Sequence, residues 1–299
     1  MAGGIPGLFF GGIFLQDRLV LGTAQLGMVY GVAGGEVPSY ERASCLLKSA
    51  WEAGVRILDT ARLYGESEDF IGRFMSDTSF FFNVITKISG SRDDMQKQFQ
   101  VSLSRLNLDS VYGLMLHHGK LLSGPHARSI VSFMLDQRDS GRARKVGFSC
   151  YDPDEALAAI DEFKPDVVQI PLNLMDRRFI ASGVLQRLKD MGAEVHVRSC
   201  FLQGLMLMEP QLSSEKVKGV APYVESVWRR AKDLGVSPMS LALSFCLSQP
   251  QVDLVVVGVD SPSQLMEILR TPIISAGQEI YRGLECDDLS IIDPRSWSR

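Results

Sequence analysis

Short apolar runs alternate with longer amphipathic stretches from Leu19 to Leu269, and this alternation limits the chain to very few folds. The apolar runs are continuously hydrophobic, as strands are when both faces of a parallel sheet are covered. The amphipathic stretches carry apolar residues at helical spacing, as in Ala43, Leu47 and Ala50. Strand–helix alternation selects an α/β fold, which is either a closed (β/α)8 barrel or an open doubly wound sheet.

The alternation predicts eight strands, each with at least one helix behind it. We expect strands at residues 18–24, 55–58, 80–87, 111–116, 145–148, 166–170, 194–198 and 254–257. Eight such units in 299 residues, with no linker and no shift in composition, favour a TIM barrel. We therefore predict a single (β/α)8 domain over residues 1–299. Residues 1–17 would form an N-terminal extension or cap, and residues 271–299 a tail that packs across the barrel or its mouth.

Two helix starts carry the spacing of a capping box. In this motif the first side chain caps the helix, and a carboxylate or amide three residues later returns the bond. The pairs are Asp152 with Glu155, and Ser261 with Gln264. In both pairs a proline occupies the first helical position, which its fixed φ angle suits. We therefore expect helices to begin there, directly after two of the apolar runs.

The composition is that of an ordinary globular protein, with 45% hydrophobic and 22% charged residues. A net charge of -4 gives no electrostatic reason to expect nucleic acid or an anionic membrane as a partner. The five cysteines are scattered without a C-x-x-C pair, so we expect neither disulfides nor zinc, and a cytoplasmic location. No apolar run reaches the ~20 residues of a membrane helix, and the apolar start lacks the basic region of a signal peptide. We expect a monomer or a weak homo-oligomer.

Four polar side chains fall at the ends of neighbouring strands. Asp59 follows residues 55–58, Lys87 ends the next strand, and His117 follows the one after that. Tyr64 lies on the loop beyond Asp59. In a (β/α)8 barrel the C-terminal ends of the strands form the active-site rim, so these side chains should converge there. An acid, a phenol, an ammonium and an imidazole together form a set that can relay a proton.

Each of these residues has a plain structural interpretation when it is taken alone. Asp59 could be a turn residue, Tyr64 core filling, and Lys87 a solvated strand end. His117 could be a buried histidine whose hydrogen bonds are satisfied. Four coincidences at one rim are a poorer explanation than a shared function. We predict that the adjacent His118 is structural, because strand alternation turns it away, and we predict no metal site because no histidine or cysteine pair has ligand spacing.

A series of motifs follows the expected strands in order. They are Gly22-Thr23-Ala24-Gln25-Leu26-Gly27, Asp59-Thr60-Ala61 with Tyr64-Gly65, Thr86-Lys87, Leu116-His117-His118, the segment from Val168 to Arg177, Arg198-Ser199 with Gln203-Gly204, and Val257-Gly258 with Ser261-Pro262 and Gln264-Leu265. Together they resemble the aldo-keto reductase family, in particular its bacterial branch, over about residues 19–269.

The resemblance implies an NAD(P)-dependent oxidoreductase that interconverts an aldehyde or ketone and its alcohol by hydride transfer, without a metal. Hydride arriving at a carbonyl carbon develops negative charge on the oxygen, which then needs a proton donor. Tyr64 would be that donor, although a free tyrosine has a pKa of about 10. Lys87 would favour the phenolate and so bring this pKa toward neutrality. Asp59 would balance Lys87, and His117 would orient the carbonyl and share the proton transfer.

The resemblance also implies where the cofactor and the substrate bind. The residues expected around the dinucleotide are Gly22, Thr23, Ala24, Asp59, Ser149, Gln169, Asn173, Arg198, Ser199, Gly258, Gln264 and Glu267. Those expected around a small carbonyl or sugar substrate are Met28, Tyr30, His117 and Phe201, with Arg62 and Lys120 as cations that could hold a polar or phosphorylated compound. For Asn173 a loop turn is an equally good interpretation, and Arg198 could instead pair with a rim carboxylate.

The sequence departs from the family pattern at three places. Cys150 stands where many members have asparagine, and Cys200 where bacterial relatives usually have proline. Residues 258–264 contain no lysine or arginine, whereas members that prefer NADP usually place basic residues there for the 2'-phosphate. Asp260 would repel that phosphate, although Arg270 could compensate if it reaches back. We therefore expect NAD or NADP as the cofactor, without a strong preference for NADP.

Three alternatives remain open. The same fold could act as an NAD-dependent sugar or alcohol dehydrogenase, or as a non-catalytic cofactor-sensing subunit like those of the channel-associated branch of the family. The third alternative is an unrelated barrel lyase or isomerase. Binding of NAD(P)H separates this last alternative from the others, and turnover of carbonyl compounds separates an enzyme from a sensing subunit.

Overall fold

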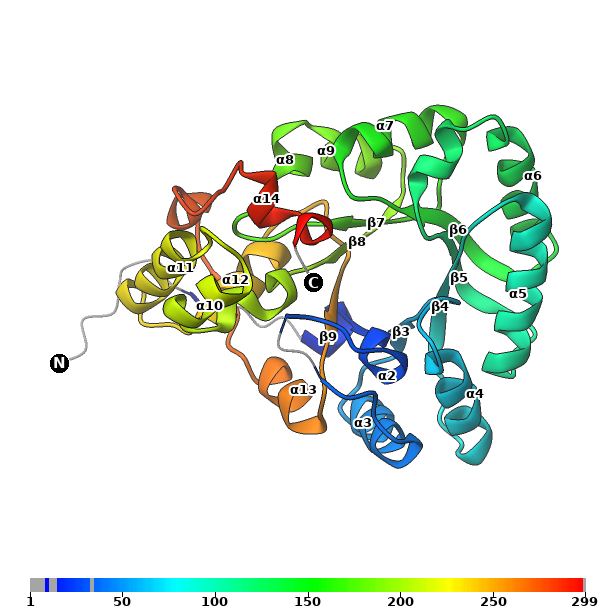
Figure 1. The fold of residues 1–299 in the computed structure, drawn as a ribbon, viewed down its shortest axis with the longest axis horizontal. Coiled ribbons are helices and arrows are strands. Elements are labelled where there is room, and N and C mark those ends of the chain that lie inside the picture. Colours follow the sequence, from blue (N-terminus) through cyan, green and yellow to red (C-terminus); the bar gives the residue numbers. More distant parts are fainter. Residues whose placement is uncertain (1–8, 11–14, 33–34, 298–299) are drawn as a thin grey trace.

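The computed structural model describes residues 9–10, 15–32 and 35–297, and its centre is a closed barrel of eight parallel strands (Figure 1). The strands are β2 (Leu19–Gly22), β3 (Ile57–Asp59), β4 (Asn83–Ile88), β5 (Val111–Leu116), β6 (Ala143–Ser149), β7 (Val167–Pro171), β8 (Glu194–Arg198) and β9 (Leu254–Gly258). They follow one another around the barrel in chain order, and the pairing of β2 with β9 closes the ring. The predicted (β/α)8 TIM barrel is confirmed.

Helices cover the outside of the barrel (Figure 1). The principal ones are α3 (Tyr40–Glu52), α4 (Ser67–Asp77), α5 (Arg92–Leu106), α6 (Ala127–Asp139), α7 (Pro153–Glu162), α9 (Val184–Asp190), α11 (Ala221–Asp233), α12 (Pro238–Leu247) and α13 (Pro262–Leu269). The short helices are α1 (Leu15–Arg18), α2 (Ala24–Gly27), α8 (Arg178–Ala181), α10 (Pro210–Lys216) and α14 (Leu289–Ile292), and 3-10 turns span Gly119–Ser123, Leu202–Leu207, Gln278–Tyr281 and Pro294–Ser296. Within the described ranges, no helix has the length and apolar character needed to cross a membrane.

The strand that the sequence predicts over 80–87 is shorter at its start than expected. It begins only at Asn83, because Phe80 and Phe82 pack against Trp51 of α3 instead of joining the barrel. The ring centroids of Trp51 are 5.5 Å from Phe80 and 5.3 Å from Phe82. Aromatic packing therefore sets the start of this strand, and a hydrophobic run alone does not show it.

The expected capping box of α7 is only half formed. Asp152 caps the helix by accepting a hydrogen bond from the backbone N–H of Glu155 (2.9 Å). The Glu155 carboxylate does not return this bond, because it accepts from the backbone N–H groups of Lys120 (2.8 Å) and Tyr151 (2.9 Å). The start of α7 is thereby tied to the loops that follow β5 and β6 at the C-terminal rim of the barrel.

A polar cluster closes the barrel at the opposite end, where the strands begin. The Glu194 carboxylate of β8 accepts a hydrogen bond from the hydroxyl of Tyr112 (2.9 Å), lies 2.7 Å from His196 Nε2, and forms an ion pair with Lys145. Burial raises the pKa of Glu194, but the bonds to His196 and Lys145 outweigh it and lower that pKa to about 2. His196 is fully buried, and its partner Glu194 lies two residues earlier on the same strand.

The tail reaches from the outside of the barrel to its rim. β1 (Phe9–Phe10) and β10 (Ile274–Ser275) form a short antiparallel pair separate from the barrel sheet. Beyond β10, Tyr281 is fully buried, with its ring centroid 5.2 Å from that of Phe245 in α12. Arg295 lies 4.2 Å over the ring of Tyr151, on the loop after β6. The rest of the predicted N-terminal extension before Leu15, including the side chains of β1, lies outside the described residues.

Gly147 in β6 leaves no room for a side chain, because a Cβ there would lie 1.6 Å from the carbonyl oxygen of Val167. We expect Gly147→Ala to lower the free energy of unfolding by about 2 kcal/mol or more, since backbone atoms must move to admit the methyl group. Gly124→Ala is the matched control, because its Cβ would lie 3.5 Å from the nearest atom, Leu121 O. Its effect should stay within about 0.5 kcal/mol. Denaturation followed by circular dichroism measures both, and equal losses would contradict this account.

Candidate active site

The structure brings the four predicted relay residues together at the C-terminal ends of β3, β4 and β5. Asp59 is the last residue of β3, Lys87 lies one residue before the end of β4, and His117 follows β5 directly. Tyr64 lies on the loop between β3 and α4. Its ring centroid is 5.1 Å from Lys87 Nζ and 5.7 Å from the ring centroid of His117.

Lys87 and Asp59 form a buried ion pair. Lys87 Nζ lies 2.6 Å from Asp59 Oδ1, and the two side chains are only 1% and 5% exposed. Lys87 also donates to the backbone oxygen of Thr60 (3.0 Å), and Asp59 Oδ2 accepts from Gln169 Nε2 (2.8 Å). An unpaired charge is costly at such burial, so each of these groups offsets the cost of burying the other.

Tyr64 is held as a neutral phenol. Burial is the main cause that raises its pKa above the usual value, the charge of Asp59 adds to it, and Arg198 acts in the opposite direction. The sequence led us to expect a pKa close to neutrality, and that expectation is wrong because burial and the charge of Asp59 raise the pKa instead. A protonated phenol is the form that can donate a proton.

His117 is neutral near physiological pH. Burial is the main cause, and the positive charges of Lys87, His118 and Arg198 add to it, so the pKa of His117 falls to about 3. Its Nδ1 atom is buried and has no hydrogen-bond partner in the described part of the chain. A neutral imidazole can donate one hydrogen bond and accept another. His118 is stacked on His117 with a centroid distance of 5.0 Å, and it is exposed at the surface.

Close backbone contact fixes the loop that carries Tyr64. A Cβ on Gly27 would lie 1.8 Å from the carbonyl oxygen of Tyr64, and one on Gly65 would lie 2.0 Å from that of Gly27. Gly65 also has a φ of +50°, in the left-handed region that favours glycine. Beside this contact, the buried hydroxyl of Ser67 donates to Thr23 Oγ1 (2.8 Å). The loop after β2 and the Tyr64 loop therefore form one unit.

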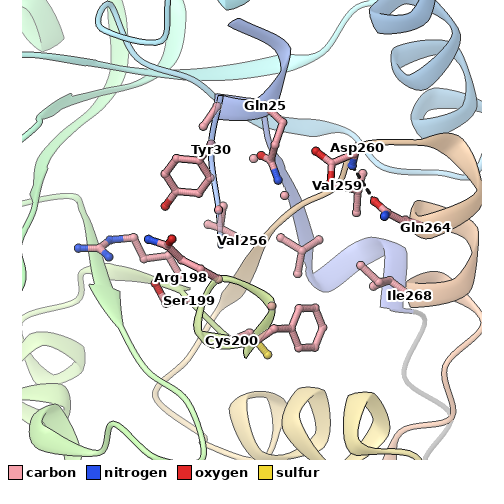
Figure 2. A pocket seen from close by; sticks show the side chains of 18 of the residues that line it. Gln25, Tyr30, Arg198, Ser199, Cys200, Val256, Val259, Asp260, Gln264 and Ile268 are labelled. Atoms are coloured by element: carbon pink, nitrogen blue, oxygen red, sulfur yellow. Dashed lines mark hydrogen bonds between the residues drawn. The ribbon is translucent and has the colours of Figure 1, made fainter. Parts of the chain in front are cut away.

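Two adjoining cavities open at this rim, and Tyr64 borders both. The larger has a volume of about 400 Å³ (Figure 2). Its lining includes the predicted cofactor residues Gly22, Thr23, Ala24, Asp59, Gln169, Arg198, Ser199, Gly258, Gln264 and Glu267. The smaller cavity, of about 190 Å³, is lined by Met28, Tyr30, Leu63, Tyr64, Lys87, His117, Ser149, Tyr151, Gln169 and Arg198. Tyr30, Gln169 and Arg198 border both cavities, as Tyr64 does.

Asn173 does not reach either cavity, so its predicted contact with the cofactor is wrong for this structure. The side chain is fully buried, and its Oδ1 accepts from the backbone N–H groups of Met175 and Asp176 (2.9 Å each). Its Nδ2 donates to the backbone oxygen of Ser199 (3.1 Å). Asn173 is therefore the loop-turn residue of the alternative interpretation, with its Oδ1 atom and one N–H of its amide bonded to the backbone.

Other predicted residues are distributed differently from the expected pattern. Ser149 was expected beside the cofactor but lines the smaller cavity, and Phe201 was expected beside the substrate but lines the larger one. Arg62 and Lys120 line neither, so the cations expected near the substrate lie elsewhere. Lys87 and Arg198 are the cations that line the smaller cavity.

Several lining residues were missed by reasoning from the sequence. The larger cavity is also bordered by Gln25, Gly31, Cys200, Gln203, Gly204, Leu207, Met239, Val256, Val257, Val259 and Ile268, and the smaller by Leu63 and Tyr151. Tyr151 could have been found, because it follows β6 by two residues at the rim where functional side chains gather. Met239 and Ile268 lie on helices, and no local signal in the sequence directs them toward a cavity.

The loop after β8 has an unusual backbone. Ser199, Leu202 and Gln203 have φ angles of 62°, 49° and 54°, which side-chain-bearing residues rarely adopt. Such conformations persist where the surrounding structure holds them, and they cluster at binding sites. Ser199 and Gln203 border the larger cavity, so this strained backbone shapes its wall (Figure 2).

The end of the larger cavity near α13 is acidic. Asp260 and Glu267 line it, and the Oε1 atom of Gln264 accepts a hydrogen bond from the backbone N–H of Asp260 (2.7 Å; Figure 2). This is the return bond of the expected α13 capping box, directed to Asp260. Arg198 is the one lysine or arginine in the described lining of this cavity. Arg42 lines a small neighbouring cavity of about 160 Å³ together with Asp260.

Tyrosine, lysine, aspartate and histidine are thus grouped at the rim of a closed (β/α)8 barrel. The sequence profile of the Aldo/keto reductase family matches residues 18–272, which is most of the chain, so the chain belongs to this family. NAD(P)-dependent carbonyl reduction is the general kind of reaction in the family. Membership therefore removes the alternative of an unrelated lyase or isomerase.

Its relatives include enzymes and a channel subunit. L-glyceraldehyde 3-phosphate reductase of Escherichia coli (strain K12) is 25% identical over 276 residues, which cover 78% of this chain and 79% of the relative. A Schizosaccharomyces pombe protein, provisionally named as a voltage-gated potassium channel subunit beta, is 25% identical over 282 residues, or 80% of each chain. Among solved structures, aldo-keto reductase AKR11C1 from Bacillus halodurans (holo form) matches with a TM-score of 0.77 at 19% identity, covering 93% of this chain and 95% of that one. This structural match shows the shared fold.

The lowered pKa of His117 predicts a loss of stability in acid. An unfolded histidine binds a proton near pH ~6.5, whereas the folded His117 does so near 3. Between these values the unfolded state holds more protons, so the free energy of unfolding falls as the pH is lowered from about 6.5 toward 3. We expect His117→Asn to lose less stability than the wild type over this range in denaturation experiments. The exposed His126→Asn is the control, and identical slopes for both variants would argue against this effect.

Proposed function

We propose that the protein reduces an aldehyde or ketone to its alcohol with NAD(P)H, with Tyr64 as the proton donor assisted by Lys87, Asp59 and His117. The observation that carries this proposal is the position of Tyr64, which borders both cavities. A proton donor placed there stands between a long cavity suited to a dinucleotide and a small one beside His117 suited to a carbonyl compound.

The residues of the larger cavity suit a nicotinamide dinucleotide. Gly258 keeps its wall open, because a Cβ there would lie 2.5 Å from the Gln25 amide. Gly22 acts similarly, since its Cβ would lie 3.3 Å from a methyl group of Val256. Gln169 uses its Nε2 atom for Asp59, which leaves its carbonyl oxygen free to accept from a carboxamide N–H.

The dinucleotide, when bound, supplies a hydride for the carbonyl carbon. The phenol of Tyr64 donates its proton to the carbonyl oxygen as negative charge develops there. Its raised pKa keeps the phenol protonated until the hydride is transferred. The ammonium of Lys87, 5.1 Å from the ring centroid, then stabilises the phenolate that donation leaves behind. Asp59 keeps Lys87 charged, and neutral His117 orients the carbonyl through a hydrogen bond.

Tyr64→Phe should lower kcat by about 10²-fold or more, because it removes the proton donor and leaves the cavity shape almost unchanged. NADH and NADPH binding, followed by the change in nicotinamide fluorescence, should stay within a factor of about two. Tyr40→Phe makes the same chemical change on α3, where the hydroxyl donates to Asp77 and lines neither cavity, and should leave turnover unaltered. Near-full turnover by Tyr64→Phe with intact cofactor binding would refute the assignment.

We also propose that NADH binds at least as tightly as NADPH. Asp260 and Glu267 place two acids at the end of the larger cavity near α13, where a 2'-phosphate would meet repulsion. Arg270 lines none of the cavities at the rim, so within the described residues it does not supply the missing cation.

Asp260→Ser should therefore raise NADPH affinity by about threefold and leave NADH affinity within about twofold, since an exposed charge contributes less than about 1 kcal/mol. Asp109→Ser removes an exposed acid from the chain just before β5, at the opposite end of the barrel, and controls for net charge. Paired titrations with NADH and NADPH provide the measurement. NADPH binding that is much tighter than NADH binding, and that is lost in Arg42→Ala, would contradict the proposal.

The comparison with the Schizosaccharomyces pombe protein favours a second candidate, a cofactor-sensing subunit without turnover. A panel of aldehydes, ketones and sugars, tested with both cofactors and in both directions, separates the candidates. Oxidation of an alcohol or sugar by NAD with little reverse activity would indicate the dehydrogenase alternative. Cofactor binding without turnover of any compound would favour the subunit.

A further inference from the structure

The smaller cavity carries a positive charge that no carboxylate of the described residues balances. Its lining contains two cations, Lys87 and Arg198, and no aspartate or glutamate. Lys87 is balanced by Asp59, which approaches it from the larger cavity. Within residues 15–32 and 35–297, Arg198 has no carboxylate at ion-pair distance. The cavity therefore offers one net positive charge to whatever enters it.

Arg198 is held in place by contacts that leave most of its donors unused. It ends β8, is half-buried, and its Nη2 atom donates to the backbone oxygen of Cys150 (3.1 Å). Its guanidinium lies 4.1 Å over the ring of Tyr151. Arg295 lies against the same ring, but Asp293 neutralises it at 2.5 Å. A stacked guanidinium keeps a planar fork of N–H donors oriented for a ligand.

This fork lies beside the groups that would perform the reaction. Arg198 borders both cavities together with Tyr64 and Gln169, and Figure 2 shows it near Tyr30 at the edge of the larger one. Its charge is among the causes that act on the pKa values of Tyr64 and His117. The smaller cavity, at about 190 Å³, is below the roughly 300 Å³ at which pockets for drug-sized ligands begin, so only a short compound fits.

We propose that the substrate is a short aldehyde or ketone that bears a carboxylate or a phosphate group, and that Arg198 binds this anionic group. The proposal rests on the reductase function proposed above. Two oxygens of such a group accept parallel N–H bonds from one guanidinium, which gives both charge balance and a fixed orientation. The anion would be held on the Tyr151 side of the smaller cavity, and the carbonyl would then face Tyr64 and His117.

Two matched substrate pairs test the proposal, and they separate the two kinds of anion. One pair is 4-oxobutanoate with butanal, and the other is glyceraldehyde 3-phosphate with glyceraldehyde. We expect the wild type to favour the anionic member of at least one pair by about 10²-fold in kcat/KM, as expected for loss of a bidentate charged contact. Which pair shows the preference identifies the carboxylate or the phosphate as the group recognised.

Arg198→Met should abolish that preference, because kcat/KM of the anionic member should fall about 10²-fold more than kcat/KM of the neutral member. Arg198→Lys keeps the positive charge but lacks the planar guanidinium. Its kcat/KM for the anionic member should lie between the values of the wild type and Arg198→Met. Arg128→Met makes the same change at an exposed arginine on α6 and should match the wild type. Circular dichroism and thermal unfolding confirm that each variant is folded. If Arg198→Met does not fold, the wild-type preference and Arg198→Lys decide the question.

Binding of succinate, which has no carbonyl to reduce, gives a readout that does not depend on turnover. Calorimetry in the presence of NADH should show succinate binding to the wild type and none to Arg198→Met. This result would support the anion site even if no carbonyl compound were reduced, so a failure of the reductase function is distinguishable. The proposal is overturned if neither pair shows an anion preference and succinate does not bind. It is also overturned if Arg198→Met weakens NADH binding and lowers both members of each pair equally, which would assign Arg198 to the cofactor.

Discussion

The buried ion pair of Asp59 and Lys87 is the interaction on which the rest of the rim depends. Neither charge could stay in that position alone, so the pair forces β3 and β4 into a fixed relation at their C-terminal ends. Gln169 of β7 bonds to the second oxygen of Asp59 and so extends the constraint across the barrel. Burial raises the pKa of the Tyr64 phenol, and the negative charge of Asp59 adds to this effect. The ion pair thus fixes the shape of the site and contributes to the protonation of its proposed proton donor.

The two ends of the barrel use buried charge for different purposes. Where the strands begin, Glu194 forms hydrogen bonds with Tyr112 and His196 and an ion pair with Lys145. None of these groups lines either of the two rim cavities. The charged groups of this cluster pair with one another, as polar groups near the bottom of a barrel do when they serve stability. At the rim the charges do not all cancel, because Arg198 has no carboxylate at ion-pair distance in the described part of the chain. An unbalanced charge beside a reactive group is a sign of a ligand.

Much of the fold and of the site could be predicted from the sequence, because both depend on regular patterns. Hydrophobic periodicity located the strands, and the rule that barrel sites lie at strand ends brought Asp59 and Lys87 together with the other relay residues. The expectations that proved wrong concern hydrogen bonds, pKa values and cavity lining, which depend on residues far away in the sequence. Asn173 has the right residue type, but backbone N–H groups use its amide. The pKa of Tyr64 depends on which charge lies closer and on burial. Lining residues such as Met239 lie on helices, and only tertiary packing determines which residues of a helix face the cavity.

The contact between Gly27 and Gly65 has a consequence for how this protein can diversify. The loop after β2 carries Met28 and Tyr30 into the smaller cavity, and the same loop touches the backbone of Tyr64. Insertions or exchanges in that loop would shift the proposed proton donor along with the specificity residues. New substrate preferences can therefore arise more readily from the tail and from the loops after β6 and β8, which reach the same cavity through Tyr151 and Arg198 without that coupling.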